Sequence, residues 1–256
     1  MAFPPYVPGS GYRSLTVRLG PSANVRGMEI PPAAPEPQSR HLMPRLAGSG
    51  LRGLARVITG VRPRFAGGRL SPQPTVYYAN HTSHGDFVLI WTVLPSLIRA
   101  RTRPVAGADY WQQGPLRQYV ANKVLDAVLI ERGKLDRNAD PTAPVLAALD
   151  AGASVIIFPE GTRNTTDAAL LPFKAGLYRL AGARPVVPLV PVWIENVCRV
   201  MPKGELLPLP LLCSVTFGEA VTYDAVERRP LFLERARQAL LALRPREAAA
   251  DQGGGR

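Results

Sequence analysis

The chain has 256 residues, 46% of them hydrophobic and 20% charged, which allows one sizeable core but leaves too little chain for two full domains. Its formal net charge of +12 requires a polyanionic partner, which can be a nucleic acid, a membrane surface or a phosphorylated substrate. Cys198 and Cys213 are too few for a disulfide framework and have no metal-ligand or redox spacing, so we predict that both lie in the core.

We find no membrane-spanning segment in the sequence. The longest apolar stretch, residues 87–98, is interrupted by Thr92, Pro95 and Ser96 and is shorter than the roughly 20 residues needed to cross a bilayer. The beginning of the chain has no basic opening and no uninterrupted apolar segment, so it does not resemble a secretory signal. We therefore expect a cytoplasmic protein.

Residues 1–45 are rich in proline and glycine, so we expect a disordered basic tail, or a start codon placed too early. Residues 46–70 are expected to form an amphipathic helix and a linker, because apolar residues recur there at helical spacing: Leu51, Leu54, Ile58 and Val61. Arg52 and Arg56 lie one turn apart on another face of this helix. Two interpretations stay open: the helix packs on the domain with solvated arginines, or it lies on an anionic membrane.

Residues 71–245 alternate short apolar runs with longer helical patterns, and residues 246–256 are expected to be a disordered tail. The expected strands cover residues 75–79, 104–108, 127–131, 154–159, 186–193 and 214–217. The expected helices cover residues 87–99, 111–125, 143–151, 176–181 and 223–243. This alternation predicts a single α/β domain with a mixed, mostly buried central sheet that is flanked by helices.

Two of the three histidines lie in residues 80–86, Asn-His-Thr-Ser-His-Gly-Asp, directly after an apolar strand. If His81 lies in the turn and Asp86 in the first helical turn, the carboxylate can hold one ring nitrogen while the other removes a proton. Alternatively, Ser83 and Asp86 form a capping box at the start of a helix, and the spacing alone does not decide. A metal site that includes His84 is disfavoured, because only three ligands are local.

A second polar run, residues 158–164, ends another apolar strand with the sequence Phe-Pro-Glu-Gly-Thr-Arg-Asn and is expected to turn at Gly161. Arg163 and Thr162 are suited to binding a phosphate. Glu160 would repel a phosphate, so we expect it to fix Arg163 or a substrate hydroxyl, the alternative being a surface Arg–Glu pair. The sequence has no Gly-x-Ser-x-Gly elbow, Walker loop or Gly-x-Gly-x-x-Gly turn, which weakens hydrolase, NTPase and dehydrogenase interpretations.

Together these motifs resemble the glycerolipid acyltransferase family, which includes bacterial 1-acylglycerol-3-phosphate acyltransferases. The matching blocks occur in the family's order at residues 80–86, 128–132, 158–163 with 173–176, and 187–192. The second block departs from the family in two positions, since Leu129 replaces the commoner Phe and Glu131 the commoner Asp. The resemblance extends from about residue 75 to residue 221.

The resemblance implies roles for individual residues. His81 is expected to be the general base that takes the proton from the acceptor hydroxyl as it attacks a thioester carbonyl, with Asp86 orienting it. The expected acceptor-binding residues are Glu160, Gly161, Thr162, Arg163 and Arg132. The resemblance implies no metal and no cofactor, with acyl-CoA or acyl-ACP as the co-substrate.

The resemblance thus implies acyl transfer to the free hydroxyl of 1-acyl-glycerol-3-phosphate, which forms phosphatidic acid. Expected partners are lysophosphatidic acid or another lysolipid, an anionic membrane surface at the cytoplasmic face, and acyl carrier protein. Alternatives are an O-acyltransferase for a non-phosphate lysolipid, such as an ornithine lipid precursor, and an inactive membrane scaffold. A nucleic-acid-binding protein is disfavoured, because aromatic residues are not interleaved with the arginines.

Overall fold

The computed structural model describes residues 42–83, 85–131, 140–196 and 213–245. The expected tail at 246–256 and residues 1–41 of the expected tail at 1–45 lie outside these ranges, as do His84, Arg132 and Cys198. The prediction was wrong for residues 42–45, which belong to a helix. Cys213 lies in the core, as predicted.

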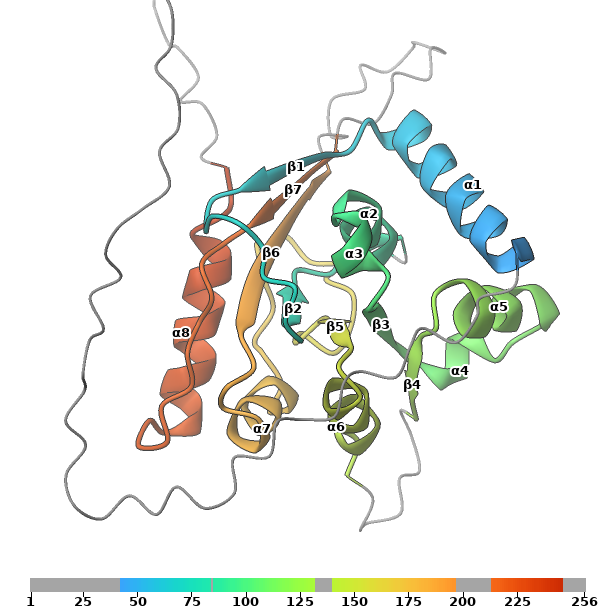
Figure 1. Ribbon diagram of the computed structural model, residues 1–256. Helices are drawn as coiled ribbons and strands as arrows, with labels where there is room; N and C mark the ends of the chain where they lie inside the picture. Colours follow the sequence, from blue (N-terminus) through green and yellow to red (C-terminus); the bar gives the residue numbers. More distant parts are fainter. Residues whose placement is uncertain (1–41, 84, 132–139, 197–212, 246–256) are drawn as a thin grey trace, which may run out of the picture. The chain divides into compact units, whose positions relative to one another are not determined.

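In the described part of the chain, seven strands form one sheet in the order β1-β7-β6-β2-β5-β3-β4 (Figure 1). Their bounds are β1 Arg62–Phe65, β2 Val76–Ala79, β3 Thr102–Gly107, β4 Val128–Ile130, β5 Ser154–Ile157, β6 Leu189–Asn196 and β7 Cys213–Phe217. Neighbouring strands are parallel except β6 and β7, which are antiparallel. The predicted α/β domain with a mixed central sheet is therefore confirmed.

Helices cover both faces of this sheet (Figure 1). Their bounds are α1 Leu42–Thr59, α2 Asp86–Val93, α3 Ser96–Arg99, α4 Ala108–Trp111, α5 Pro115–Tyr119, the π-helical turn η1 Val120–Val124, α6 Ala143–Asp150, α7 Gly176–Ala183 and α8 Arg229–Leu241. Successive strand residues point to opposite faces, so Tyr77 packs with α2, α3 and η1, whereas Tyr78 packs with α6, α7 and α8. Two hydrophobic cores thus enclose the central strands.

Three expected helices have different bounds in the structure. The helix expected at 87–99 is divided at Pro95 into α2 and α3. The helix expected at 111–125 is broken into α4, α5 and η1, because Gly114 adopts a φ of +86° and Pro115 starts a new helix. The last helix begins at Arg229 rather than at residue 223, with a proline in its first turn.

Strand β1 lies in the stretch that we expected to be helix and linker, so the sheet begins before residue 71. The sequence Arg-Pro-Arg-Phe has no apolar alternation, because all four residues of this edge strand are exposed. The strand pairs in parallel with β7, and the ring of Phe65 stacks on that of Phe217 at a centroid distance of 5.4 Å.

The predicted amphipathic helix is present as α1, which contacts α2 and η1. Gly48 is buried at this contact, where a Cβ atom would lie 3.4 Å from the Trp91 ring. On the outer side, Leu54 and Val57 are 58% and 78% exposed. No helix in the described ranges combines the length and apolarity that a membrane crossing requires.

The close approach of the backbone after β1 to the backbone after β7 leads to a prediction about stability. A Cβ atom at Gly67 would lie 2.3 Å from the carbonyl oxygen of Gly218, and backbone cannot yield as a flexible side chain can. We expect Gly67→Ala to lower the free energy of unfolding by about 1–3 kcal/mol, the usual cost of overpacking. Urea unfolding followed by circular dichroism measures the change.

The matched control is Gly53→Ala in α1, where a Cβ atom meets nothing within 4 Å. Replacing this helical glycine is expected to stabilise the protein by about 0.5–1 kcal/mol. If Gly67→Ala were as stable as the wild type, β1 would not pack against β7 as described.

Candidate active site

The two polar runs meet at one edge of the sheet because of strand direction. β2, β5 and β6 are adjacent and parallel, so their carboxyl ends lie together. Residues 80–86 follow β2 and residues 158–164 follow β5. The backbone N–H of Asn164 donates to the carbonyl oxygen of His81 at 2.7 Å, which joins the two loops directly.

Asp86 is the first residue of α2 and is fully buried, and its carboxylate organises the turn before the helix. Its Oδ2 accepts backbone N–H groups of Thr82 at 2.6 Å and Ser83 at 2.8 Å, and lies 3.0 Å from His81 Nδ1. The Ser83 hydroxyl accepts from Gly85 N–H instead of completing a capping box. Asp86 therefore fills both roles that the sequence left open, ordering the turn and holding the imidazole.

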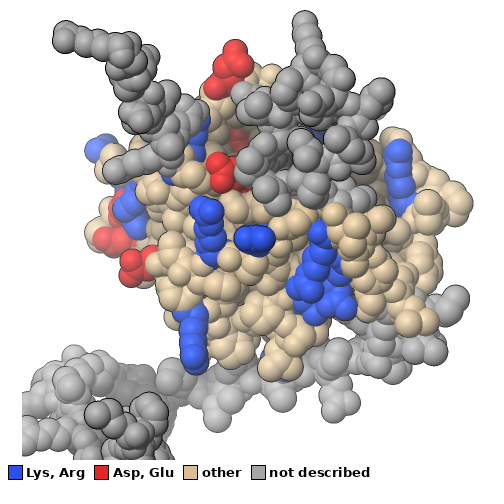
Figure 2. All heavy atoms as spheres, turned by 90° about the horizontal axis from the view of Figure 1, so that it is seen from above, with Lys and Arg blue, Asp and Glu red and all other residues tan. Residues whose placement is uncertain are grey.

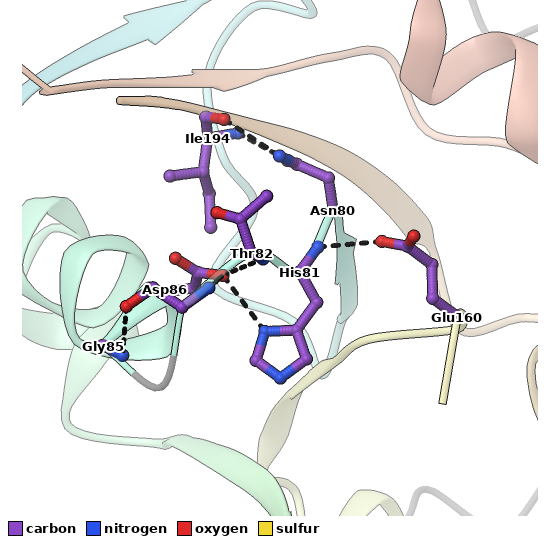
Figure 3. A network of polar contacts seen from close by, with 8 residues as sticks. Asn80, His81, Thr82, Gly85, Asp86, Glu160 and Ile194 are labelled. Atoms are coloured by element: carbon purple, nitrogen blue, oxygen red, sulfur yellow. Dashed lines mark hydrogen bonds and ion pairs between the residues drawn. The ribbon is translucent and has the colours of Figure 1, made fainter. Parts of the chain in front are cut away.

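The contact with Asp86 fixes which His81 nitrogen carries a proton. A carboxylate only accepts hydrogen bonds, so Nδ1 carries the hydrogen and Nε2 keeps a free lone pair. Nε2 points away from Asp86 (Figure 3), and the His81 side chain is 13% exposed. The ring also stacks on Phe158 with centroids 4.1 Å apart and 17° between planes. This geometry can present one oriented nitrogen to a substrate proton.

Glu160 does not pair with Arg163, which was one of the two partners that we expected for it. Its Oε1 accepts the backbone N–H of His81 and its Oε2 that of Leu171, both at 2.8 Å (Figure 3 shows the first). The side chain is buried, and each of its two oxygens accepts from a backbone amide rather than from a guanidinium group. Burial raises the pKa of the Glu160 carboxyl, and the two amides and His81 partly oppose that shift.

Asn80 has a structural role that sequence reasoning missed. Its amide nitrogen donates to the Ile194 carbonyl at 2.9 Å, and its amide oxygen accepts from the Ile194 N–H at 2.7 Å (Figure 3). The side chain thereby extends the pairing of β2 with β6 by one residue. The sequence signal that could have revealed this role is a polar amide at the end of a strand that is buried on both faces.

The remaining predicted site residues lie at the surface of the second loop. The expected turn occurs at Gly161, whose φ of +73° favours glycine. Thr162 and Arg163 are exposed, and among the described residues no carboxylate pairs with Arg163. Lys174 packs its aliphatic stem over Gly161, where a Cβ atom would lie 3.1 Å from Lys174 Cγ. Two cationic side chains therefore flank this turn.

Within the described ranges, no group of three or more His, Cys, Asp or Glu side chains is placed to hold a metal ion. His84, which the metal alternative required, lies outside those ranges.

Two curated relatives are 1-acyl-sn-glycerol-3-phosphate acyltransferases from plants. The chloroplastic BAT2 protein of Brassica napus is 32% identical over 143 residues, covering 53% of this chain and 37% of the relative. The protein of Cocos nucifera is 28% identical over 183 residues, covering 66% of this chain and 55% of the relative. The chain thus spans about a third to just over half of the lengths of these relatives.

The crystal structure of the 1-acyl-sn-glycerophosphate acyltransferase PlsC from Thermotoga maritima has the same fold. Its TM-score is 0.59 at 19% identity, with 82% of this chain and 86% of that chain covered. The sequence model of the family described as Acyltransferase matches residues 62–195, more than half of the chain. The match includes both loops of the site, and the protein therefore belongs to the acyltransferase family.

Proposed function

We propose that the protein transfers a fatty acyl group from an acyl thioester to the free hydroxyl of 1-acyl-glycerol-3-phosphate, which forms phosphatidic acid. The main support is the His81–Asp86 pair, with 3.0 Å between Nδ1 and Oδ2 and with Nε2 pointing away from Asp86 (Figure 3). The names of the two plant relatives support the acceptor. The donor is acyl-CoA or acyl-ACP, and we propose no further cofactor.

In this proposal His81 acts as general base. Nε2 takes the proton of the acceptor hydroxyl while the hydroxyl oxygen attacks the thioester carbonyl carbon. The resulting tetrahedral intermediate collapses, the C–S bond breaks, and the imidazolium returns its proton to the departing sulfur. The products are an ester and a free thiol, so no acyl-enzyme is required. Asp86 remains ionised and stabilises the imidazolium through Nδ1–H.

The second loop supplies the binding site for the acceptor phosphate. The fork of Arg163 suits two phosphate oxygens, and the Thr162 hydroxyl adds a donor beside it. Gly161 allows the chain to turn there, since its φ of +73° is strained for other residues. Arg132 follows β4 closely in the sequence and is a second candidate for the phosphate.

We further propose that α1 places the protein on an anionic membrane, at the cytoplasmic face. Leu54 and Val57 are exposed on this helix, beside Arg52 and Arg56. The pKa of the half-buried Arg99 is lowered by burial first and then by repulsion from Arg52 and Arg56, so the three positive charges lie near one another. Seen from above, the right side of the described surface shows Lys and Arg side chains but no Asp or Glu (Figure 2).

The role of His81 can be tested by release of thiol from a long-chain acyl thioester, with and without lysophosphatidic acid. We expect His81→Ala to lower acceptor-dependent release by about 10²- to 10⁴-fold, the usual contribution of a positioned base. The melting temperature should stay close to that of the wild type, because Asp86 Oδ2 keeps its two backbone amides when the imidazole is removed. Release that is unchanged by His81→Ala would refute the mechanism.

The phosphate site can be tested with Arg163→Ala on two acceptors, lysophosphatidic acid and a lysolipid without phosphate. Losing a charge-assisted hydrogen bond worth about 1.5–3 kcal/mol should raise KM for the phosphate acceptor roughly 10- to 100-fold. The exposed Arg229 at the start of α8 provides a control, Arg229→Ala, which should leave both KM values unchanged. Equal losses on both acceptors would favour a non-phosphate lysolipid, such as an ornithine lipid precursor.

The membrane proposal can be tested by sedimentation with vesicles that contain phosphatidylglycerol. At about 1 kcal/mol for each basic residue, Arg52→Gln with Arg56→Gln should weaken binding roughly 30-fold. The matched control replaces Arg228 and Arg229, two exposed arginines, by Gln. Equal binding by the α1 variant and the wild type would mean that this helix only packs on the domain.

A further inference from the structure

The loop after β5 holds the main chain of His81 from both sides. Glu160 Oε1 accepts the His81 N–H at 2.8 Å, and the Asn164 N–H donates to the His81 carbonyl at 2.7 Å. Phe158, from the same loop, supports the ring at a centroid distance of 4.1 Å. His81 is thus fixed by residues about 80 positions further along the chain, besides its local contact with Asp86.

Glu160 and Asn164, which bond the N–H and the carbonyl of His81, form a clamp on its main chain. The side chain of Asn164 stiffens the outer side of this clamp. Its amide oxygen accepts from the N–H of Thr166 at 3.0 Å and from the Thr166 hydroxyl at 2.8 Å. Its amide nitrogen donates to the carbonyl of Ala168 at 2.6 Å. The loop is therefore closed on itself while the backbone N–H of Asn164 is directed at His81.

Glu160 forms the inner side of the clamp, and its environment does not suit contact with an acceptor. Only 1% of the residue is exposed, and its second oxygen accepts the N–H of Leu171 at 2.8 Å. Thr162 and Arg163, two and three residues later, are exposed. A carboxylate that is buried at a cost in desolvation, with each oxygen on a backbone amide, holds the chain in place.

We propose that Glu160 is a positioning residue for His81, which acts through the His81 backbone amide and does not touch the acyl acceptor. The inference rests on the proposed role of His81 as the base. The imidazole must reach Asp86 with Nδ1 and the acceptor hydroxyl with Nε2 at the same time. Hydrogen bonds to the N–H and the carbonyl of His81 fix the main chain on both sides of its Cα atom, and so fix the position and direction of the Cα–Cβ bond. A misplacement of about 1 Å can lower a rate about 10²-fold.

The test separates kcat from KM for lysophosphatidic acid in the full-length protein. Glu160→Met has a similar size but removes both acceptors, and we expect kcat to fall by about 10²-fold with little change in KM. Glu160→Gln keeps one oxygen that can serve one amide, so it should recover part of kcat. Glu195→Gln, which neutralises a half-buried glutamate on β6 bonded to Ser214, should behave like the wild type.

Hydrogen exchange of the His81 amide, measured by NMR, provides a readout that does not depend on activity. The amide should exchange slowly in the wild type and in Glu195→Gln, and faster in Glu160→Met. Because the wild type itself must show this protection, the proposal remains testable if Glu160→Met does not fold.

Three results would overturn the proposal. A higher KM with unchanged kcat in Glu160→Met would mean that Glu160 binds the acceptor. Unchanged kcat and KM would mean that the clamp does not matter for the reaction. Wild-type exchange of the His81 amide as fast as that of exposed loops would mean that the clamp is absent. If the wild type shows no acceptor-dependent thiol release, the proposed function fails, while the exchange rates still decide whether Glu160 holds His81.

Discussion

Parallel pairing of β2 with β5 and β6 is the constraint on which the site depends. In this register Tyr78 lies opposite both Ile157 and Pro191, so β2 and β5 end at nearly the same level, while β6 continues to Asn196. Residues that are far apart in the sequence then continue from the same edge into neighbouring loops. A shift by one residue would also move every side chain of a central strand to the opposite face, so that Tyr77 and Tyr78 would each enter the core built around the other. The packing of the two cores therefore determines where the loops meet.

Two buried carboxylates occupy this edge, and backbone amides satisfy most of their acceptor sites. Asp86 Oδ2 receives two amides and the imidazole, and Glu160 receives one amide on each oxygen. Burying charged groups is costly unless they are hydrogen-bonded, and such bonds to backbone require one particular course of the chain. Asp86 Oδ1, in contrast, has no partner among the described residues although it is buried. The polar residues thus specify the loop conformation more than they add to stability.

The sequence predicted those parts of the structure that depend on local spacing. The contact of His81 with Asp86 could be predicted because the two residues are only five positions apart, one just after a strand and the other at the start of a helix. The alternation of apolar runs predicted the α/β sheet, because each buried strand is apolar on both faces. Strand β1 was missed, since an exposed edge strand with two arginines has no such pattern. The partners of Glu160 and Asn80 were also missed, because backbone amides carry no signal in the sequence and depend on the register of strands far apart in the chain.

The conformation of Gly161 explains how one short loop can serve two purposes. Its positive φ reverses the chain between Glu160, which points into the protein, and Thr162 and Arg163, which are exposed. Among the described residues, the guanidinium of Arg163 therefore makes no ion pair with Glu160 that would compete with the amides of His81 and Leu171. Separating the two charges leaves the carboxylate to the main chain and the guanidinium to solvent. A loop built in this way can hold the main chain of His81 with its buried carboxylate while its cationic side chains remain exposed for a ligand.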